Sequence, residues 1–276
     1  MVNKGVGAGW KMLVKRKFSF VQIISVAVAI LSALHTVWLA SQMNALRTNC
    51  GGAGIGGKSF SLLGQRRDHE NMPWLQIVVL YSSKSKNLMR SIAALVEELP
   101  HPTDPMYGKI TILVVNHDDS ADEFDQAREE YKSNAAVSLV RGRTKADAGW
   151  PVDTPPATAR LIDTLRSHGL ERTQHVMLVE DSRTVCPNAL EAIHYLVRKA
   201  YRYAPSWRAL RAAVGMTGVI LHGTDAAALA KYLHDFAGRR DADMLLSEWM
   251  VGVSDTQDPP RPHFVFRSNT FYSPAE

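Results

Sequence analysis

Cysteine is scarce in this chain, and an N-glycosylation acceptor is absent. Cys50 and Cys186 are its two cysteines, and no Asn-x-Ser/Thr triplet occurs in its 276 residues. Two cysteines cannot form a disulfide framework, so a chain of this length relies on an apolar core. Cys50 either pairs with its counterpart in a homodimer or remains a free thiol.

Several widespread catalytic motifs are also missing. The sequence contains no Gly-x-Ser-x-Gly, no Walker loop and no Gly-x-Gly-x-x-Gly that follows a strand. Their absence argues against an α/β-hydrolase, a P-loop NTPase and a Rossmann oxidoreductase. His175, His194, His222 and His234 lack the paired spacing of zinc ligands, so we predict no zinc site.

Charge is absent from residues 18–40, a long apolar segment. At about 1.5 Å per residue, a helix of this length crosses about 30 Å of hydrocarbon, which predicts a transmembrane signal anchor. A cleaved signal peptide is the alternative. Five basic residues precede the segment, which favours a cytoplasmic tail over 1–17 and a lumenal remainder: Lys4, Lys11, Lys15, Arg16 and Lys17.

The same five cations account for the net charge of +5. The rest of the chain carries equal numbers of basic and acidic residues, so its charge gives no support to nucleic-acid binding. Residues 41–72 are rich in glycine and charge and cannot bury a core, which predicts a flexible stem. Residues 73–276 then form the predicted lumenal domain of catalytic type.

Within 73–276, short apolar runs alternate with longer amphipathic ones. We predict strands at 75–81, 110–115, 136–140, 175–179, 218–222 and 263–267. The predicted helices are 85–99, 120–131 with a Ser120–Glu123 capping box, 157–168, one starting at Pro187 and stopped by Pro205, and one capped by Asp225 and ending at Gly238. This alternation favours an α/β fold, with a mostly parallel sheet flanked by helices.

Polar residues follow two of the predicted strands. In parallel sheets, ligands bind beyond the carboxyl ends of the strands. Glu180 and Asp181 lie there after strand 175–179, where they either hold a divalent cation or form a solvated turn. Ser82 and Ser83 follow strand 75–81, where they either contact a nucleotide or form the turn that enters the next helix.

Two further carboxylates, Asp243 and Glu248, flank an apolar Met-Leu-Leu segment. A carboxylate beside apolar groups can act as a general base, because desolvation raises its pKa. The alternative is a helix N-terminus, where acidic residues are favoured by the helix dipole.

The order of these features resembles the GT-A glycosyltransferases of the secretory pathway. The resemblance covers about residues 73–272 and is greatest to the branching N-acetylglucosaminyltransferases of the GnT-IV type and their algal or protist relatives. It is carried by the anchor and stem followed by short motifs: Val179-Glu180-Asp181, Cys186-Pro187, Trp207, Gly215-Met216-Thr217-Gly218-Val219-Ile220, Asp243-Met244-Leu245-Leu246 and Trp249.

The resemblance implies a GT-A-like, Rossmann-like domain that binds a nucleotide-sugar donor. It implies donor contacts at Glu180 and Asp181, with Mn²⁺ or Mg²⁺ on Asp181, and a base at Asp243 or, failing that, Glu248. Ser182 stands where those enzymes carry another acidic residue.

The resulting hypothesis is a type II Golgi membrane enzyme that transfers a sugar, such as N-acetylglucosamine, to a hydroxyl of a glycan or glycoprotein. Its predicted partners are the donor, this acceptor and the lipid bilayer. The alternatives are a non-catalytic, membrane-tethered glycan-binding or scaffolding domain, and a different anchored α/β enzyme.

Overall fold

The computed structural model describes residues 72–83, 85–118, 122–143, 154–253 and 261–273. Among these residues, no helix combines the length and the apolar character that a bilayer crossing requires. The predicted tail (1–17), the predicted anchor (18–40) and nearly all of the predicted stem lie outside the described residues.

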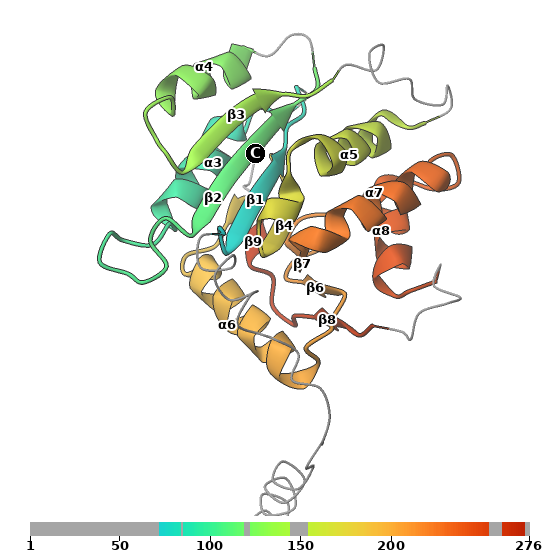
Figure 1. Ribbon diagram of the computed structural model, residues 1–276. Helices are drawn as coiled ribbons and strands as arrows, with labels where there is room; N and C mark the ends of the chain where they lie inside the picture. Colours follow the sequence, from blue (N-terminus) through green and yellow to red (C-terminus); the bar gives the residue numbers. More distant parts are fainter. Residues whose placement is uncertain (1–71, 84, 119–121, 144–153, 254–260, 274–276) are drawn as a thin grey trace, which may run out of the picture. The chain divides into compact units, whose positions relative to one another are not determined.

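A seven-stranded sheet forms the centre of the described domain (Figure 1). Its strand order is β3-β2-β1-β4-β7-β6-β8. The strands are β1 (Leu75–Leu80), β2 (Ile110–Asn116), β3 (Val137–Arg141), β4 (His175–Glu180), β6 (Ala209–Arg211), β7 (Val219–His222) and β8 (His263–Val265). Strands β3, β2, β1 and β4 are parallel, and β6 is parallel to β8, whereas β7 is antiparallel to both β4 and β6. The predicted mostly parallel sheet is confirmed.

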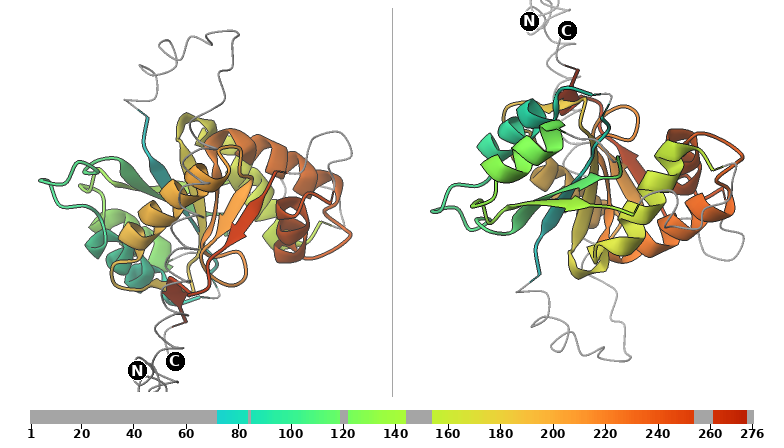
Figure 2. Two further views of the ribbon diagram at one scale, coloured as in Figure 1. Left: turned by 90° about the horizontal axis from the view of Figure 1, so that it is seen from below. Right: turned by 90° about the horizontal axis from the view of Figure 1, so that it is seen from above.

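Helices cover both faces of this sheet (Figure 2). They are α3 (Leu88–Glu97), α4 (Asp122–Glu130), α5 (Pro156–Ser167), α6 (Ala189–Tyr203), α7 (Ala226–Asp235) and α8 (Ala242–Met250), with short 3₁₀ turns η1 (Leu170–Arg172) and η2 (Gly223–Asp225). Side chains alternate between the faces of a strand, so the core has two parts. Helices α3, α4 and α6 pack with Ile77 and Val79 on one face, and α5, α7 and α8 pack with Val78 and Leu178 on the other.

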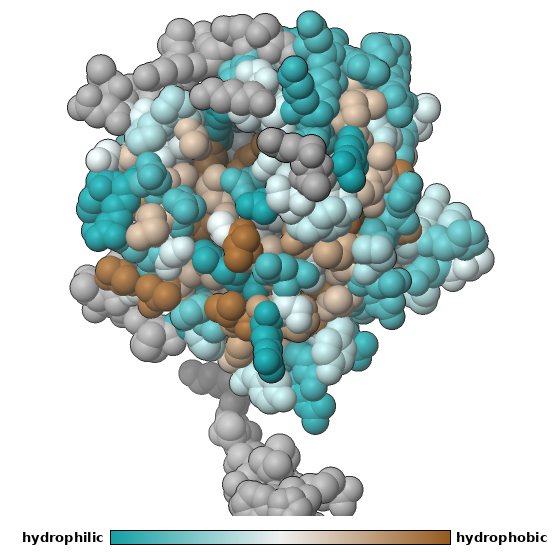
Figure 3. Space-filling model, turned by 180° about the vertical axis from the view of Figure 1, so that it is seen from behind, coloured by the Kyte–Doolittle hydropathy of each residue, from teal (hydrophilic) through white to brown (hydrophobic). Residues whose placement is uncertain are grey.

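Apolar side chains are mostly enclosed between these layers. Seen from behind, the surface shows small hydrophobic groups separated by hydrophilic ones (Figure 3). Such a surface is typical of a domain that buries its apolar residues in an internal core.

The structure corrects several predicted element boundaries. Helix α6 begins at Ala189, after Asn188 in the left-handed conformation with φ 61°, so Pro187 does not occupy its first turn. Asp225 precedes α7 but makes no side-chain cap; its carboxylate instead binds Arg261 at 2.6 Å. The last predicted strand ends at Val265, and residue 120 of the predicted capping box lies outside the described residues.

Several short elements were not predicted from the sequence. Strand β6 is one, and β5 (Thr184–Val185) and β9 (Phe271–Tyr272) pair in a separate two-stranded sheet. Each has only two or three residues, too few to show a hydrophobic period.

Candidate functional site

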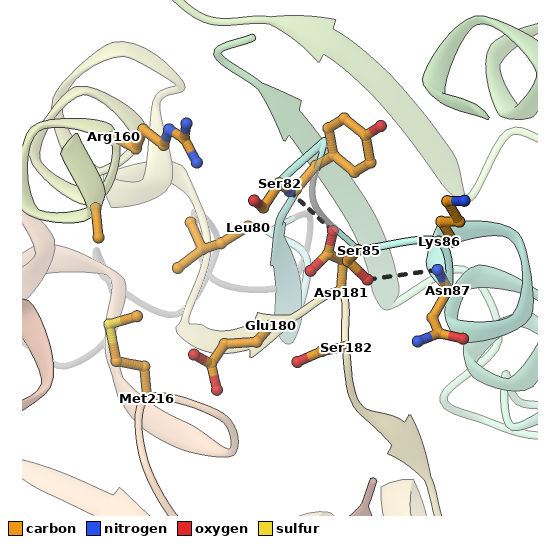
Figure 4. Close-up of a pocket in the computed structure, with 12 residues that line it drawn as sticks. Leu80, Ser82, Ser85, Lys86, Asn87, Arg160, Glu180, Asp181, Ser182 and Met216 are labelled. Atoms are coloured by element: carbon orange, nitrogen blue, oxygen red, sulfur yellow. Dashed lines mark hydrogen bonds between the residues drawn. The ribbon is translucent and has the colours of Figure 1, made fainter. Parts of the chain in front are cut away.

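The candidate site lies where β1 and β4 end side by side. The two strands are parallel with Leu80 opposite Glu180, so the residues that follow both strands meet at one edge of the sheet. A cavity of about 690 Å³ opens at this edge (Figure 4). Its lining comprises Leu80, Tyr81, Ser82, Ser85, Lys86, Asn87, Ala157, Arg160, Glu180, Asp181, Ser182 and Met216. Three of the four residues predicted to bind the donor therefore line one cavity.

Asp181 is held inside this cavity with only 3% of its surface exposed. Ser82 N donates a hydrogen bond to its Oδ2 at 2.8 Å. Ser91 Oγ donates to the Asp181 carbonyl at 2.8 Å, which fixes the backbone at Asp181 to α3. Burial raises the pKa of Asp181 to about 7, and repulsion from Glu123 and Glu180 adds to the rise although the Ser82 bond opposes it. The Asp181 carboxylate therefore takes up a proton more readily than an ordinary aspartate does.

Glu180 is half-buried and is held by a different element. The Thr217 hydroxyl, in the loop before β7, donates to Glu180 Oε2 at 3.1 Å and accepts from Glu180 N at 3.1 Å. The two neighbouring carboxylates point in different directions: Glu180 is directed toward Met216, and Asp181 toward Ser82 (Figure 4). They therefore face separate parts of the cavity.

Two cations also line the cavity, and sequence reasoning missed both. Lys86 lies before α3, and Arg160 lies in the first half of α5. Arg160 Nη2 donates to Asp118 Oδ1 at 2.5 Å, while Ser83 N donates to Asp118 Oδ2 at 2.8 Å. Ser83 thus contacts Asp118 and is not among the residues that line the cavity.

Asp118 holds Arg160 beside the cavity as a charged partner. Burial alone would raise the pKa of Asp118, but hydrogen bonds from Ser83 and the charge of Arg160 outweigh burial and hold the pKa below its ordinary value. Asp118 lies two residues after the end of β2, so the rule that found Glu180 and Asp181 could also have identified it. Arg160 carried no such signal, because a cation in an amphipathic helix is ordinarily solvated.

The predicted bases, Asp243 and Glu248, are not among the residues that line this cavity. Asp243 is exposed in the first turn of α8, where its Oδ1 accepts a hydrogen bond from Met244 N at 2.8 Å. Glu248 accepts from Tyr232 Oη at 2.9 Å, pairs with Arg240 at 3.1 Å and also pairs with Arg239. These bonds join α8 to α7 and its following turn, so Glu248 has a structural role between the two helices.

The donor set suits a cation shared with a ligand better than an all-protein metal site. Within the described ranges, no group of three or more His, Cys, Asp or Glu side chains converges as metal ligands. Mg²⁺ and similar ions are commonly bound by one or two carboxylates together with substrate phosphates. Asp181 fits this role, because burial and nearby carboxylates raise its pKa and a bound cation would stabilise its charged form.

Comparison with known proteins gives a structural likeness only. No family model matches the chain, and no curated protein matches its sequence. The chain is similar to TarS of S. aureus, with 12% identity and a TM-score of 0.46 over 72% of this chain, and it spans 60% of one TarS crystal structure (residues 1–349) and 36% of another. It is also similar to the mannosyltransferase PcManGT from Pyrobaculum calidifontis in complex with GDP-Man and Mn²⁺, with 15% identity and a TM-score of 0.44 over 88% of this chain and 68% of that one.

The chain thus spans less than two thirds of the TarS chains that it matches. These TM-scores lie below 0.5, so the likeness carries no conclusion about the chemistry of the site.

Proposed function

We propose that residues 73–276 form a GT-A-like glycosyltransferase domain that binds a nucleotide-sugar donor at the edge of β1 and β4. One observation carries the proposal. Two carboxylates, Glu180 and Asp181, and two cations, Lys86 and Arg160, line a single cavity beyond the carboxyl ends of parallel strands. This is the place where open α/β sheets bind nucleotides.

The charges of this cavity suit a nucleoside diphosphate joined to a sugar. Arg160 and Lys86 supply cationic donors that phosphate oxygens accept. A divalent cation on Asp181 would neutralise the diphosphate as it leaves. Glu180, which is directed toward Met216, is placed for the hydroxyls of the sugar or of the acceptor.

Transfer requires an acceptor hydroxyl to lose its proton while it attacks the anomeric carbon and the diphosphate departs. Asp243 stays our predicted base on the sequence; it is exposed in the first turn of α8 and is not among the residues that line the cavity. The finer features of the proposal rest on the sequence. They are N-acetylglucosamine transfer of the GnT-IV type, a type II Golgi topology and a homodimer through Cys50.

Calorimetry with the purified chain tests donor binding. We expect UDP-sugars or GDP-sugars to bind in the presence of Mn²⁺ and to bind more weakly after chelation. Asp181→Asn should reduce the affinity by about tenfold or more, because a bond to a charged group contributes about 1.5–3 kcal/mol. Asp235→Asn is the matched control, since Asp235 is an α7 carboxylate that pairs with Lys231 on the surface.

Two results would contradict the proposal. One is a wild-type chain that binds no nucleotide sugar with or without Mn²⁺. The other is an equal donor affinity for Asp181→Asn and Asp235→Asn. Binding of a glycan without any donor binding would instead favour the non-catalytic, glycan-binding alternative.

A further inference from the structure

The loop between β6 and β7 has a conformation that its glycines define. Gly215 and Gly218 both have φ near 70°, in the left-handed region that favours glycine. The loop is closed by a bond from Ala212 N to Gly218 O at 2.8 Å, and Gly218 N anchors it to Leu178 O of β4 at 2.8 Å. The intervening Met216 and Thr217 are therefore fixed relative to the end of β4.

Thr217 uses this fixed position to hold Glu180 at two points. The Thr217 side chain is fully buried, and its hydroxyl bonds both the backbone N–H and the Oε2 of Glu180. Both bonds end on one residue, so they set the direction of its carboxylate relative to its backbone. Gly215 lies on the same side, where an added Cβ would be 3.6 Å from Glu180 Oε2.

We propose that Thr217 is a positioning residue, which holds the Glu180 carboxylate toward Met216 for contact with the reacting sugar or acceptor. This inference rests on the proposed glycosyltransferase function. Without the hydroxyl, the Glu180 side chain would lose its bond to the loop and sample other rotamers. Groups held in a reactive geometry lower the barrier because their ordering precedes the reaction.

Three variants separate the hydroxyl from the volume of the side chain. Thr217→Val removes the hydroxyl with little change in shape, and Thr217→Ser keeps the hydroxyl but removes the methyl group. Thr184→Val is the matched control, since Thr184 is 3% exposed and, among the described residues, its Oγ1 lacks a hydrogen-bond partner. The same change at Thr184 therefore removes a buried hydroxyl that does not hold a catalytic group.

The readouts are kcat and KM for sugar transfer, the donor Kd and the thermal midpoint. We expect Thr217→Val to lower kcat by between about tenfold and about a hundredfold, the cost of a small misplacement at a reacting centre. Its donor Kd should change by a smaller factor than kcat does, because the cations and Asp181 remain in place. Thr217→Ser should recover most of kcat, and Thr184→Val should match the wild type.

Equal kcat values for Thr217→Val and Thr184→Val would overturn the assignment, as would a Thr217→Ser variant as slow as Thr217→Val. A wild type without donor binding or transfer would instead reject the proposed function. In that case, crystal structures of the wild type and Thr217→Val still test the inference. A Glu180 carboxylate that leaves its position in Thr217→Val supports the positioning role of Thr217, and an unmoved carboxylate overturns it.

Discussion

Asp181 is a buried carboxylate with a near-neutral pKa, so its protonation links the stability of the domain to pH. An Asp ordinarily titrates near 3.8, whereas burial and nearby carboxylates raise the pKa of Asp181 to about 7 in the folded domain. Between these values the folded chain binds more protons at Asp181 than the unfolded chain does. The contribution of Asp181 to stability is therefore fully present below about pH 4 and is lost as the pH rises toward 7.

This linkage predicts a pH-dependent effect of Asp181→Asn in metal-free buffer. Relative to the wild type, the variant should gain up to about 1.4 kcal/mol of unfolding free energy per pH unit between about pH 4 and pH 7. Urea titrations across this range measure the difference. Buried histidines change the stability with pH in the opposite direction, since burial lowers the pKa of His175 to about 4. Their contribution is the same in the variant and the wild type, so it cancels in the difference between the two.

Asp235→Asn serves again as the control, because Lys231 holds the pKa of the exposed Asp235 below its ordinary value. The difference between this variant and the wild type should therefore stay constant between about pH 4 and pH 7. Parallel stability curves for Asp181→Asn and the wild type over this interval would contradict the linkage.

At the same scale, only part of the site was predictable from the sequence. Glu180 ends a long apolar strand and Asp181 follows it, so their place at the sheet edge could be predicted. Arg160 could not, because its helix shows which face is apolar but not which polar residue turns toward the cavity. Thr217 lies in one of the motifs that carry the resemblance, but its contact with Glu180 could not be predicted, because it depends on two bonds to a residue 37 positions away.

At the scale of elements, the β6–β7 loop depends on glycine for two separate reasons. At Gly218 an added Cβ would lie 2.9 Å from Ala213 N, and φ is near 70°. Gly108 has the same φ but has no heavy atom within 4 Å of an added Cβ. Comparing the two positions therefore separates the steric contact from the backbone conformation.

We expect Gly108→Ala to reduce the free energy of unfolding by about 1–2 kcal/mol, the cost of a left-handed residue with a Cβ. Gly218→Ala should cost at least about 1 kcal/mol more, because the backbone of Ala213 must move to relieve the contact. Urea midpoints of both variants provide the measurement. A Gly218→Ala variant as stable as Gly108→Ala would show that the loop yields easily.

Element prediction worked where apolar runs were long and failed where elements were short. Strands β1, β2 and β4 each have six or seven residues, and the predicted runs overlap all three. Strands β5 and β9 have two residues each, so their pairing is created by the tertiary fold. The predicted start of α6 at Pro187 is wrong, because the left-handed Asn188 lies between Pro187 and the first helical residue.

At the scale of the whole described domain, the reversal of β7 is what completes the site. Val219 at the start of β7 pairs with Leu178 near the end of β4. Because β7 runs opposite to β4, the loop before β7 reaches the edge where β1 and β4 end. A parallel strand in this position would begin at the opposite edge, and its preceding loop could not contact Glu180.

The remaining prediction concerns how the chain is placed in a cell, and it rests on sequence because residues 18–40 lie outside the described structure. We expect the full chain, translated with microsomes, to stay in the membrane after carbonate extraction, because an uncharged helix of this length spans the hydrocarbon. The basic residues of the 1–17 tail should keep that tail on the cytoplasmic side. Protease should therefore spare a C-terminal tag until detergent is added.

A chain without residues 18–40 is the control and should be neither inserted nor protected. A protected but shortened, carbonate-soluble product would favour the cleaved signal peptide, and digestion of the tag without detergent would contradict the lumenal placement of the domain.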